Sequence, residues 1–363
     1  MTDLSTLDML RDSLKRYCSE HYNFQQRWAV LSQPVGFSGQ AWSDYAEFGW
    51  LALRLPEDDG GIEGDAKAIG AVMEVVGSHL LMEPLLASTV LGTGLLLRQG
   101  SADQRRAWFP RLAEGSLKLA FAHQTGTQGP CLFRGGKLYG QLINVLHGDI
   151  ADKLLVAAQS DGNPVVCVVD GHALQCNAYK LVDGRSASSV QFNAVAAELL
   201  GDSPDGAAAA IEDTLDEASV ALCAETLGVV SKLVEATNAY LKVRKQFGRT
   251  LASNQALQHR MVELYLLLQE VRALVETAQY ALKLEGSERT RLISGARAFI
   301  ISAARRIGNE AVQMHGGVGV TDELDVSHYF RRLMVLAALY GNRDHQFIRF
   351  LQATNPCRQE VVQ

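Results

Sequence analysis

The sequence lacks the features that would assign it to a membrane, secreted or nucleic-acid-binding class. It has no run of about 18 apolar residues, so no transmembrane helix is expected. Its N-terminal stretch has mixed charge and no continuous apolar segment, unlike a secretory signal. It has no basic stripe either, since 34 Lys and Arg stand against 40 Asp and Glu, a formal net charge of −6. We therefore expect neither a membrane span nor a nucleic-acid partner.

Paired cysteines are also missing. None of the six cysteines forms a Cys-x-x-Cys pair, so zinc-ribbon and thioredoxin-like sites are not expected, and no cluster has the spacing of a metal site. Scattered thiols of this kind are typical of a reducing compartment, which predicts a cytoplasmic protein. The six are Cys18, Cys131, Cys167, Cys176, Cys223 and Cys357.

Length and composition predict a globular protein of two or three domains. The chain has 363 residues, of which 47% are hydrophobic and 20% charged, enough to bury a large core. Residues 1–113 are predicted to be helical, 114–203 β-rich and 204–363 helical again. We therefore predict a mostly α, α+β protein. Its parts are a helical N-terminal domain, a middle β-barrel or sandwich domain and a C-terminal antiparallel four-helix bundle.

Local patterns support these three regions. In the first, Leu10, Leu14 and Tyr17 share a helical stripe, and a Pro-, Gly- and Asp-rich loop is predicted over 56–65. In the third, two long apolar stripes with a short linker between them are typical of a helix bundle. The middle region has short β-type runs between turn residues, which favours a barrel or sandwich. These runs cover 117–122, 137–139, 153–158, 165–169 and 190–192.

Two segments of the third region combine residues that suit a pyrophosphate group. The first is Tyr240-Leu-Lys-Val-Arg-Lys-Gln-Phe-Gly248, followed by Ser253-Asn-Gln255, and its arginine offers a planar fork of donors. The second is Gln313-Met-His-Gly-Gly-Val-Gly-Val-Thr321, whose glycines allow another group to approach the backbone. Taken singly, each is more often an ordinary helix end. The glycine segment also lacks the strand-to-helix context of a dinucleotide fingerprint.

Taken together, in this order and spacing, the segments resemble the C-terminal domain of the acyl-CoA dehydrogenase family. The helix, β, helix order of the whole chain is similar to that family as well. So are a loop in the first region and a run of strands in the middle one. The residues that carry the resemblance are Arg244-Lys-Gln-Phe-Gly248, Asn254-Gln255, Gln313-Met-His-Gly-Gly317, Tyr329-Phe-Arg331, Pro56-Glu-Asp-Asp-Gly-Gly61 and Gly140 to Val156.

This resemblance implies a flavin-dependent enzyme that acts on an acyl-CoA thioester. Members are similar in binding FAD between subunits. They remove the α-proton with a carboxylate while the β-hydride moves to the flavin. The resemblance assigns the adenine and pyrophosphate contacts to the two segments: Arg244, Lys245, Gln246, Phe247, Asn254, Gln255, Gln313, Met314, His315, Gly316 and Gly317.

The sequence departs from the family pattern where the catalytic base is expected. The usual Tyr-Glu-Gly-Thr stretch falls on Leu339-Tyr-Gly-Asn342, which puts Tyr340 at the glutamate position. A second family position lies in Asp-x-Glu-Arg, which reads Asp216-Glu-Ala-Ser219 here and puts Ala218 at the base. Tyrosine is a poor base because its reference pKa is about 10, and alanine cannot be a base. We therefore assign no catalytic residue with certainty.

The loop that cups the flavin ring in the family is altered as well. It reads His123-Gln-Thr-Gly-Thr-Gln-Gly-Pro130 in place of Thr-Glu-Pro-x-x-Gly-Ser. The dinucleotide half of the site is thus kept, while the ring and substrate half is changed. This asymmetry resembles the heteromeric acyl-CoA dehydrogenases of bacterial steroid and dicarboxylate breakdown. The stretches Asp322–Asp325, His328–Arg332 and Asp344–His345 are similar to the smaller subunits of that group.

The resemblance therefore implies a subunit that shares its sites with a paralogous partner, as an α2β2 complex. It also implies an acyl-CoA substrate and an electron-transfer flavoprotein or similar acceptor. One alternative is a homomeric dehydrogenase or oxidase whose base has moved. Another is a non-catalytic subunit that completes a partner's FAD site. His315 and His345 are expected to be packing residues. The carboxylates considered for a relocated base are Glu225, Glu323, Asp325 and Asp344.

Overall fold

The computed structural model describes residues 4–127 and 129–354, with side chains from Leu7 onward, so Cys357 lies outside the described residues. The chain divides into two compact units. Apart from the first two residues, one unit comprises Arg27–Asp65 and Met82–Ala218, and the other comprises Asp3–Gln26, Ala66–Leu81 and Ser219–Gln363. The three-domain division expected from the sequence stays a prediction. Among the described residues, no helix is both long enough and apolar enough to span a membrane.

Short helices form the first part of the first unit. Helix α6 begins with a capping box, in which Ser101 Oγ accepts from Gln104 N and Gln104 Oε1 accepts from Ser101 N. Pro84 stands immediately before the π-helix η2, whose residues are all buried. Helix α2 (Phe24–Leu31) crosses the boundary between the units. The other elements are α3 (Gly39–Glu47), η1 (Glu57–Asp59), η2 (Leu85–Gly92), α5 (Thr93–Gln99) and α6 (Ala102–Ala113).

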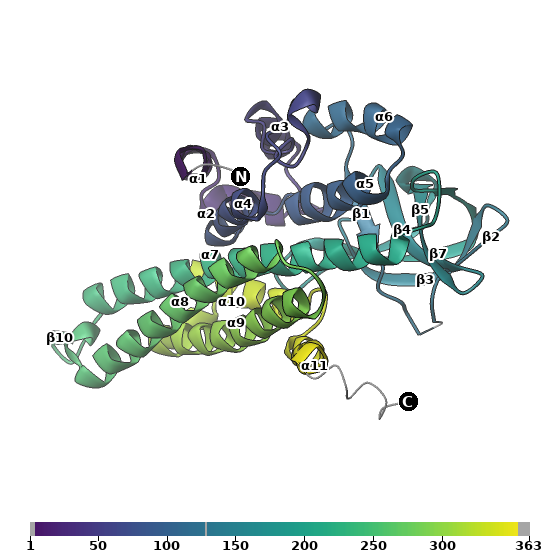
Figure 1. Cartoon of the computed structure of the whole chain (residues 1–363). Helices are drawn as coiled ribbons and strands as arrows, with labels where there is room; N and C mark the ends of the chain where they lie inside the picture. Colours follow the sequence, from purple (N-terminus) through teal and green to yellow (C-terminus); the bar gives the residue numbers. More distant parts are fainter. Residues whose placement is uncertain (1–3, 128, 355–363) are drawn as a thin grey trace. The chain divides into compact units, whose positions relative to one another are not determined.

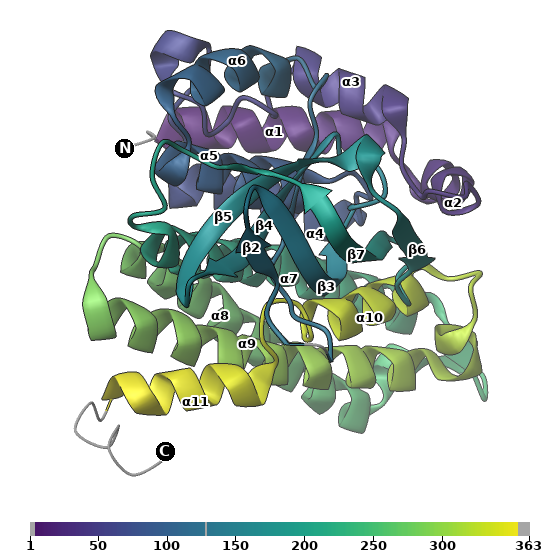
Figure 2. The same ribbon diagram turned by 90° about the vertical axis from the view of Figure 1, so that its right-hand side faces the viewer.

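The rest of the first unit is one mixed sheet, drawn in teal in Figure 2. Its strands follow the order β6-β7-β3-β2-β4-β5-β8, and β1 pairs in parallel with β4. A positive-φ turn at Asp161 and Gly162 (+50° and +83°) closes the β4–β5 hairpin. The strands are β1 (Leu119–Ala122), β2 (Leu132–Arg134), β3 (Lys137–Leu146), β4 (Lys153–Ser160), β5 (Asn163–Asp170), β6 (Cys176–Lys180), β7 (Ser186–Ala196) and β8 (Glu198–Leu199), with the 3-10 turn η3 (Gly171–Ala173) between β5 and β6.

The expected β region is therefore confirmed, and of the two forms expected for it, barrel or sandwich, the structure shows no closed barrel. The strand path ends at β6 on one side and at β8 on the other, so the sheet stays open. One face of the sheet is covered by its own apolar core, which includes Leu142, Val156, Val190 and Phe192. Short strands and frequent turns are common to barrels and open sheets. The pairing of the two outermost strands cannot be read from such a pattern.

Two cysteines lie side by side in this sheet core. Burial raises the pKa of Cys131 to about 11. Burial, together with the neighbouring Cys131, raises the pKa of Cys167 to about 12. In the second unit Cys223 is also fully buried, and burial raises the pKa of its thiol. These three thiols are packing groups of the core.

Long helices dominate the second unit, as the two apolar stripes predict. Figure 1 shows α8 (Gln255–Ala281) beside α9 (Gly286–His315), and Figure 2 shows α11 (Arg343–Thr354) along α9. Apolar residues at helical spacing, Leu264, Leu268 and Val271 among them, are buried. Helix α1 (Leu4–His21) packs on α4 (Ala66–His79). The remaining helices are α7 (Ala207–Val243) and α10 (Asp325–Leu336), and the residues of α7 up to Ala218 belong to the first unit.

A buried ion pair links two of these helices. Arg332 of α10 donates through Nε to Glu225 Oε1 and through Nη2 to Glu225 Oε2 of α7, both at 2.8 Å. The two side chains are 3% and 0% exposed. A bidentate pair gives these donors and acceptors hydrogen-bond partners, which offsets the free-energy penalty of burying the two charges. Beside it, the buried Arg297 of α9 donates to the carbonyls of Leu336 and Leu339 at the end of α10.

We expect Glu225→Ala to lower the free energy of unfolding by about 3–5 kcal/mol, because it leaves the guanidinium of Arg332 buried without its bidentate carboxylate. Urea unfolding followed by far-UV circular dichroism measures the change. The double variant Glu225→Leu/Arg332→Met should recover most of the loss, since it removes both charges at similar volume. A single-variant loss below about 1 kcal/mol would contradict this role.

Candidate functional site

A small exposed hairpin follows the end of α7. Strands β9 (Lys245–Gln246) and β10 (Arg249–Thr250) pair antiparallel. The two residues between them, Phe247 and Gly248, both have positive φ (+51° and +81°), as a type I′ turn requires. The Phe247 ring is 100% exposed. A two-residue turn with an aromatic tip thus stands clear of the second unit at the end of the bundle (Figure 1).

A glycine turn ends α9. Helix α9 stops at His315, and Gly316 has φ +69°, a conformation that favours glycine. A Cβ built on Gly316 or Gly317 would meet no atom within 4 Å, so this backbone is open to an approaching group. Gln313 is exposed, whereas Met314 and His315 are buried. The short helix η5 (Gly316–Val320) continues the chain.

The structure brings the hairpin and the glycine turn to one end of the bundle. The ring of Tyr240, near the end of α7, stacks on His315 with 4.3 Å between ring centroids. Its hydroxyl also donates to the His315 carbonyl at 3.3 Å. At the same end, the Arg260 side chain of α8 donates to Glu310 of α9 at 2.6 Å. Residues that are 75 positions apart in the sequence, Tyr240 and His315, therefore meet at this end of the bundle.

The groups at this end suit a phosphate-bearing ligand. Arg244, Lys245 and Arg249 are all exposed, so their cations point to solvent around the hairpin. Asn254 stands before α8, where its side chain donates to the Leu251 carbonyl at 3.1 Å, and Gln255, the first residue of that helix, is exposed. Guanidinium donors beside an open glycine backbone fit the pyrophosphate of a dinucleotide. His315 contributes its backbone and its ring packing, with Nδ1 against the Ala311 carbonyl at 2.8 Å.

The turn at Tyr340 is built for packing. Tyr340 has φ +51° and Gly341 has φ +104°, and the Tyr340 carbonyl accepts from Gln346 Nε2 at 3.2 Å. Burial raises the pKa of the Tyr340 hydroxyl well above its ordinary value of 10. A phenol that holds its proton this firmly cannot accept one at neutral pH.

The stretch around Ala218 contributes to a cluster of charged side chains that no sequence pattern revealed. Glu217 accepts from Arg54 Nη2 at 2.7 Å and from Arg98 Nη2 at 2.6 Å. Burial alone would raise the pKa of Glu217, but the two guanidinium groups outweigh it and hold the pKa below its ordinary value. Ala218 itself is fully buried. The three charged residues are far apart in the sequence, so no local pattern reveals the cluster.

The carboxylates considered for a relocated base are found in ordinary structural settings. Glu225 forms the buried pair with Arg332, and Asp344 pairs with its neighbour Arg343. Asp325 is the first residue of α10, and Glu323 is exposed. His345 is largely exposed, and the partial burial of its ring, followed by the charge of Arg349, lowers its pKa. Within the described residues, no three His, Cys, Asp or Glu side chains gather as a metal site.

The altered loop after β1 carries a neutral histidine. The His123 ring stacks on Phe121, with 5.2 Å between centroids and 15° between planes. Burial lowers the pKa of His123 to about 4, so the ring is uncharged at neutral pH. Gln124 and Gly126 bond to β3 through Ile143 N and Gln141 O. Gln128 of this loop lies outside the described residues.

Comparisons with known proteins identify the family of this chain. The acyl-CoA dehydrogenase N-terminal domain matches residues 5–116, and the acyl-CoA dehydrogenase C-terminal domain matches residues 205–353. This chain belongs to the acyl-CoA dehydrogenase family.

Individual relatives cover nearly the whole chain. Acyl-CoA dehydrogenase IpdE2 of Mycolicibacterium smegmatis is 29% identical over 343 residues, or 94% of this chain and 96% of that protein. Among solved structures, a variant of the Tcur3481–Tcur3483 steroid ACAD is 26% identical with a TM-score of 0.88, covering 97% of this chain and 98% of that one. The ChsE4–ChsE5 complex from Mycobacterium tuberculosis shares the fold, with a TM-score of 0.88 at 22% identity over 99% of each chain.

The Glu217 cluster gives a pH-dependent prediction. The folded pKa of Glu217 lies below its ordinary 4.5, so its contribution to stability is present above that value and is lost as pH falls through the folded pKa. Glu217→Gln should therefore lower the melting temperature at neutral pH, and the gap to the wild type should shrink between about pH 6 and about pH 3. Glu263→Gln, which breaks an exposed pair with Arg306, is the matched control and should change little. A gap that stays constant with pH would contradict the assignment.

Proposed function

We propose that this chain is a subunit of a flavin-dependent acyl-CoA dehydrogenase, whose FAD and substrate sites are completed by a paralogous subunit. FAD is the cofactor, and the reaction is the α,β-dehydrogenation of an acyl-CoA thioester. The observation that carries the proposal is an asymmetry. The residues for the dinucleotide end are all present and assembled, while neither usual base position holds a carboxylate.

The dinucleotide end provides binding. The guanidinium of Arg244 and the ammonium of Lys245 would neutralise the pyrophosphate. The Gln313 amide and the open backbone at Gly316 and Gly317 would approach it closely. Phe247, exposed at the hairpin tip, would cover apolar surface on the ligand or on the neighbouring subunit. Because all these groups face outward from one end of the bundle, they suit a ligand that is held mainly by another subunit.

The chemistry needs a base that this chain does not provide at the expected places. FAD, when bound, supplies the hydride acceptor. A carboxylate must then reach the α-proton of the thioester. The buried Tyr340 keeps its own proton, and Ala218 has no acidic group. Glu217 and Glu225 are each held by arginines. A base from a second subunit completes the reaction without disturbing these contacts.

Relatives of this chain support the heteromeric form and a steroid- or lipid-derived acyl group. The Tcur3481–Tcur3483 protein is a steroid ACAD named for two chains, and ChsE4–ChsE5 is a complex. IpdE2 is itself an acyl-CoA dehydrogenase of similar length. An electron-transfer flavoprotein or similar acceptor would reoxidise the flavin.

We expect Arg244→Ala to lower the FAD content of the assembled complex by about tenfold or more, since it removes a charge-assisted contact to the pyrophosphate. Flavin absorbance per protein measures the occupancy. Arg272→Ala, at an exposed arginine on α8 away from the hairpin, is the matched control and should keep full occupancy. Because Arg244 is exposed, the melting temperature without flavin should not change. A stability loss with normal FAD content would refute the binding role.

The partner requirement is tested by expressing the chain alone and together with acyl-CoA dehydrogenase chains encoded beside it. We expect the lone chain to carry little FAD and to show no acyl-CoA oxidation with an artificial electron acceptor. The co-purified pair should be yellow and active, because the second chain supplies the base and the ring-binding loop. Stoichiometric FAD and turnover in the lone chain would overturn the proposal in favour of a homomer. FAD binding by a pair that has no turnover would favour a structural subunit.

A further inference from the structure

One aromatic pair links the two segments of the dinucleotide end. The Tyr240 ring of α7 stacks on the His315 ring of α9, with 4.3 Å between centroids and 27° between planes. His315 is 6% exposed, and its Nδ1 lies 2.8 Å from the Ala311 carbonyl, so its ring has a fixed orientation. The pair therefore sets the position of the end of α9 on α7.

On the side of α7, the pair is one helical turn away from Arg244. Residues four apart lie on the same face of a helix, and the Arg244 amide donates to the Tyr240 carbonyl at 2.9 Å. The Arg244 carbonyl in turn accepts from Leu251 N at 2.9 Å, which closes the base of the hairpin. The Arg244 side chain and the hairpin thus start from a backbone that is fixed next to Tyr240.

On the side of α9, the pair is next to the open glycine backbone. His315 is the last residue of α9, and Gly316 directly follows it. A Cβ on Gly319 would come within 2.9 Å of the His315 Cβ, so η5 also lies directly against this residue. A shift of His315 would therefore move the backbone at Gly316 and Gly317.

The Tyr240 hydroxyl has an electrostatic effect at this helix end. The last carbonyls of a helix have no partner within the helix and carry the negative end of its dipole, which disfavours an anion nearby. Tyr240 Oη donates to one of them, the His315 carbonyl, at 3.3 Å. This bond compensates part of the negative charge beside the glycine backbone that a pyrophosphate would approach.

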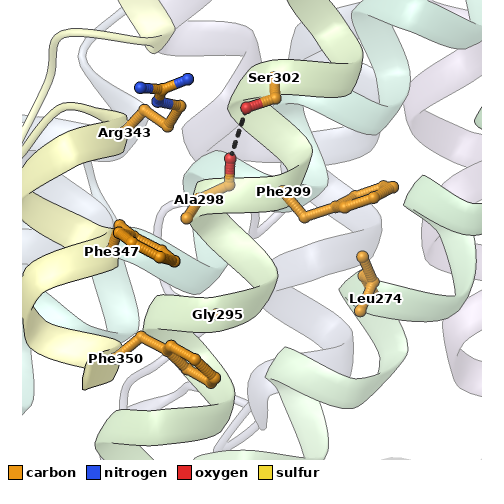
Figure 3. Close-up of a pocket in the computed structure, with 8 residues that line it drawn as sticks. All are labelled: Leu274, Gly295, Ala298, Phe299, Ser302, Arg343, Phe347 and Phe350. Atoms are coloured by element: carbon orange, nitrogen blue, oxygen red, sulfur yellow. Dashed lines mark hydrogen bonds between the residues drawn. The ribbon is translucent and has the colours of Figure 1, made fainter.

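The groove of about 610 Å³ beside α11 does not compete for such a ligand. Figure 3 shows aromatic rings of α9 and α11 around it. Of its polar residues, Ser302 donates to the Ala298 carbonyl at 3.1 Å, and Arg343 pairs with Asp344 at 2.6 Å. Ser302 lies about 20 Å along α9 from His315, at 1.5 Å per residue. The groove is thus a separate, mainly apolar feature, and a charged ligand fits the hairpin end better.

We propose that Tyr240 is a positioning residue for the dinucleotide site. Its ring holds the end of α9 on α7, and its hydroxyl pairs with the last carbonyl of α9. The Arg244 guanidinium and the backbone at Gly316 and Gly317 are thereby held where they face one pyrophosphate. Tyr240 needs no contact with the ligand itself. This inference rests on the proposed function and deepens it, because it names the residue that fixes the spacing of the two binding segments.

Equilibrium dialysis of FAD against the assembled complex, after removal of the bound flavin, measures the effect. We expect Tyr240→Leu to raise the Kd of FAD by about tenfold, since the ring stack and the hydroxyl are both lost. Tyr240→Phe keeps the stack and loses only the hydroxyl, so it should raise the Kd by about threefold. Tyr280→Leu, at an exposed tyrosine near the opposite end of α8 from the hairpin, is the matched control and should leave the Kd unchanged.

A double-mutant cycle separates positioning from a general loss of stability. If Tyr240 acts through Arg244, Tyr240→Leu should raise the Kd by no more than about threefold in an Arg244→Ala background, whereas independent effects multiply. Circular dichroism identifies the variants that fold. If Tyr240→Leu does not fold, Tyr240→Phe is used in the same cycle, and its threefold effect should disappear in the Arg244→Ala background.

The outcomes distinguish this inference from the proposed function. A Kd that stays unchanged in the folded Tyr240 variants overturns the positioning role. So does an effect of Tyr240→Leu, or of Tyr240→Phe in its place, that is equally large with and without Arg244. Both results leave the proposed function intact as long as Arg244→Ala alone weakens FAD binding. If Arg244→Ala leaves the Kd unchanged, the FAD site and the role of Tyr240 are both wrong.

Discussion

The second unit depends on one buried ion pair, between Glu225 and Arg332. It joins α7 to α10, and Arg297 beside it ties α9 to the end of α10 through two carbonyls. Three helices are thus fixed by guanidinium groups in an otherwise apolar core. Buried charges of this kind require good geometry, so they specify one arrangement of the helices more strictly than aliphatic packing does. The Tyr340 turn and the start of α11 follow directly from the end of α10, and their positions are set by the same contacts.

The binding of carboxylates by arginines also explains why Glu217 and Glu225 are unsuited to catalysis. Glu217 is held by Arg54 and Arg98 in the first unit, and Glu225 by Arg332 in the second. Each carboxylate is bonded directly to one or two guanidinium groups. To release it for proton transfer would strand a buried guanidinium. The groups of the dinucleotide end, in contrast, are exposed, so they hardly affect the free energy of folding and are available to a ligand.

Much of this architecture can be predicted from the sequence, because periodic patterns and turn residues act locally. The apolar stripes predict the bundle. The family resemblance, and not a local pattern, assigned the Arg244 and Gln313 segments to one ligand, and the structure stacks Tyr240 on His315 near both segments. Strands β2, β6 and β8 were missed because they are short or polar. The open edge of the sheet depends on strand pairing between distant segments. The arginine clusters involve residues more than a hundred positions apart, for which no local pattern exists.

The buried thiols described above have a consequence for how the protein can be observed. A thiol with a pKa of about 11 or 12 is a thiolate only on the order of once in 10,000 molecules or less at neutral pH, so Cys131 and Cys167 should resist alkylation while the sheet is intact. Cys223 is equally enclosed, in the other unit. Their modification requires local opening, so the rate at which each thiol reacts reports the opening of its own unit. The alkylation rates of these thiols therefore report the opening of each unit, and mass spectrometry can measure them separately without an added probe.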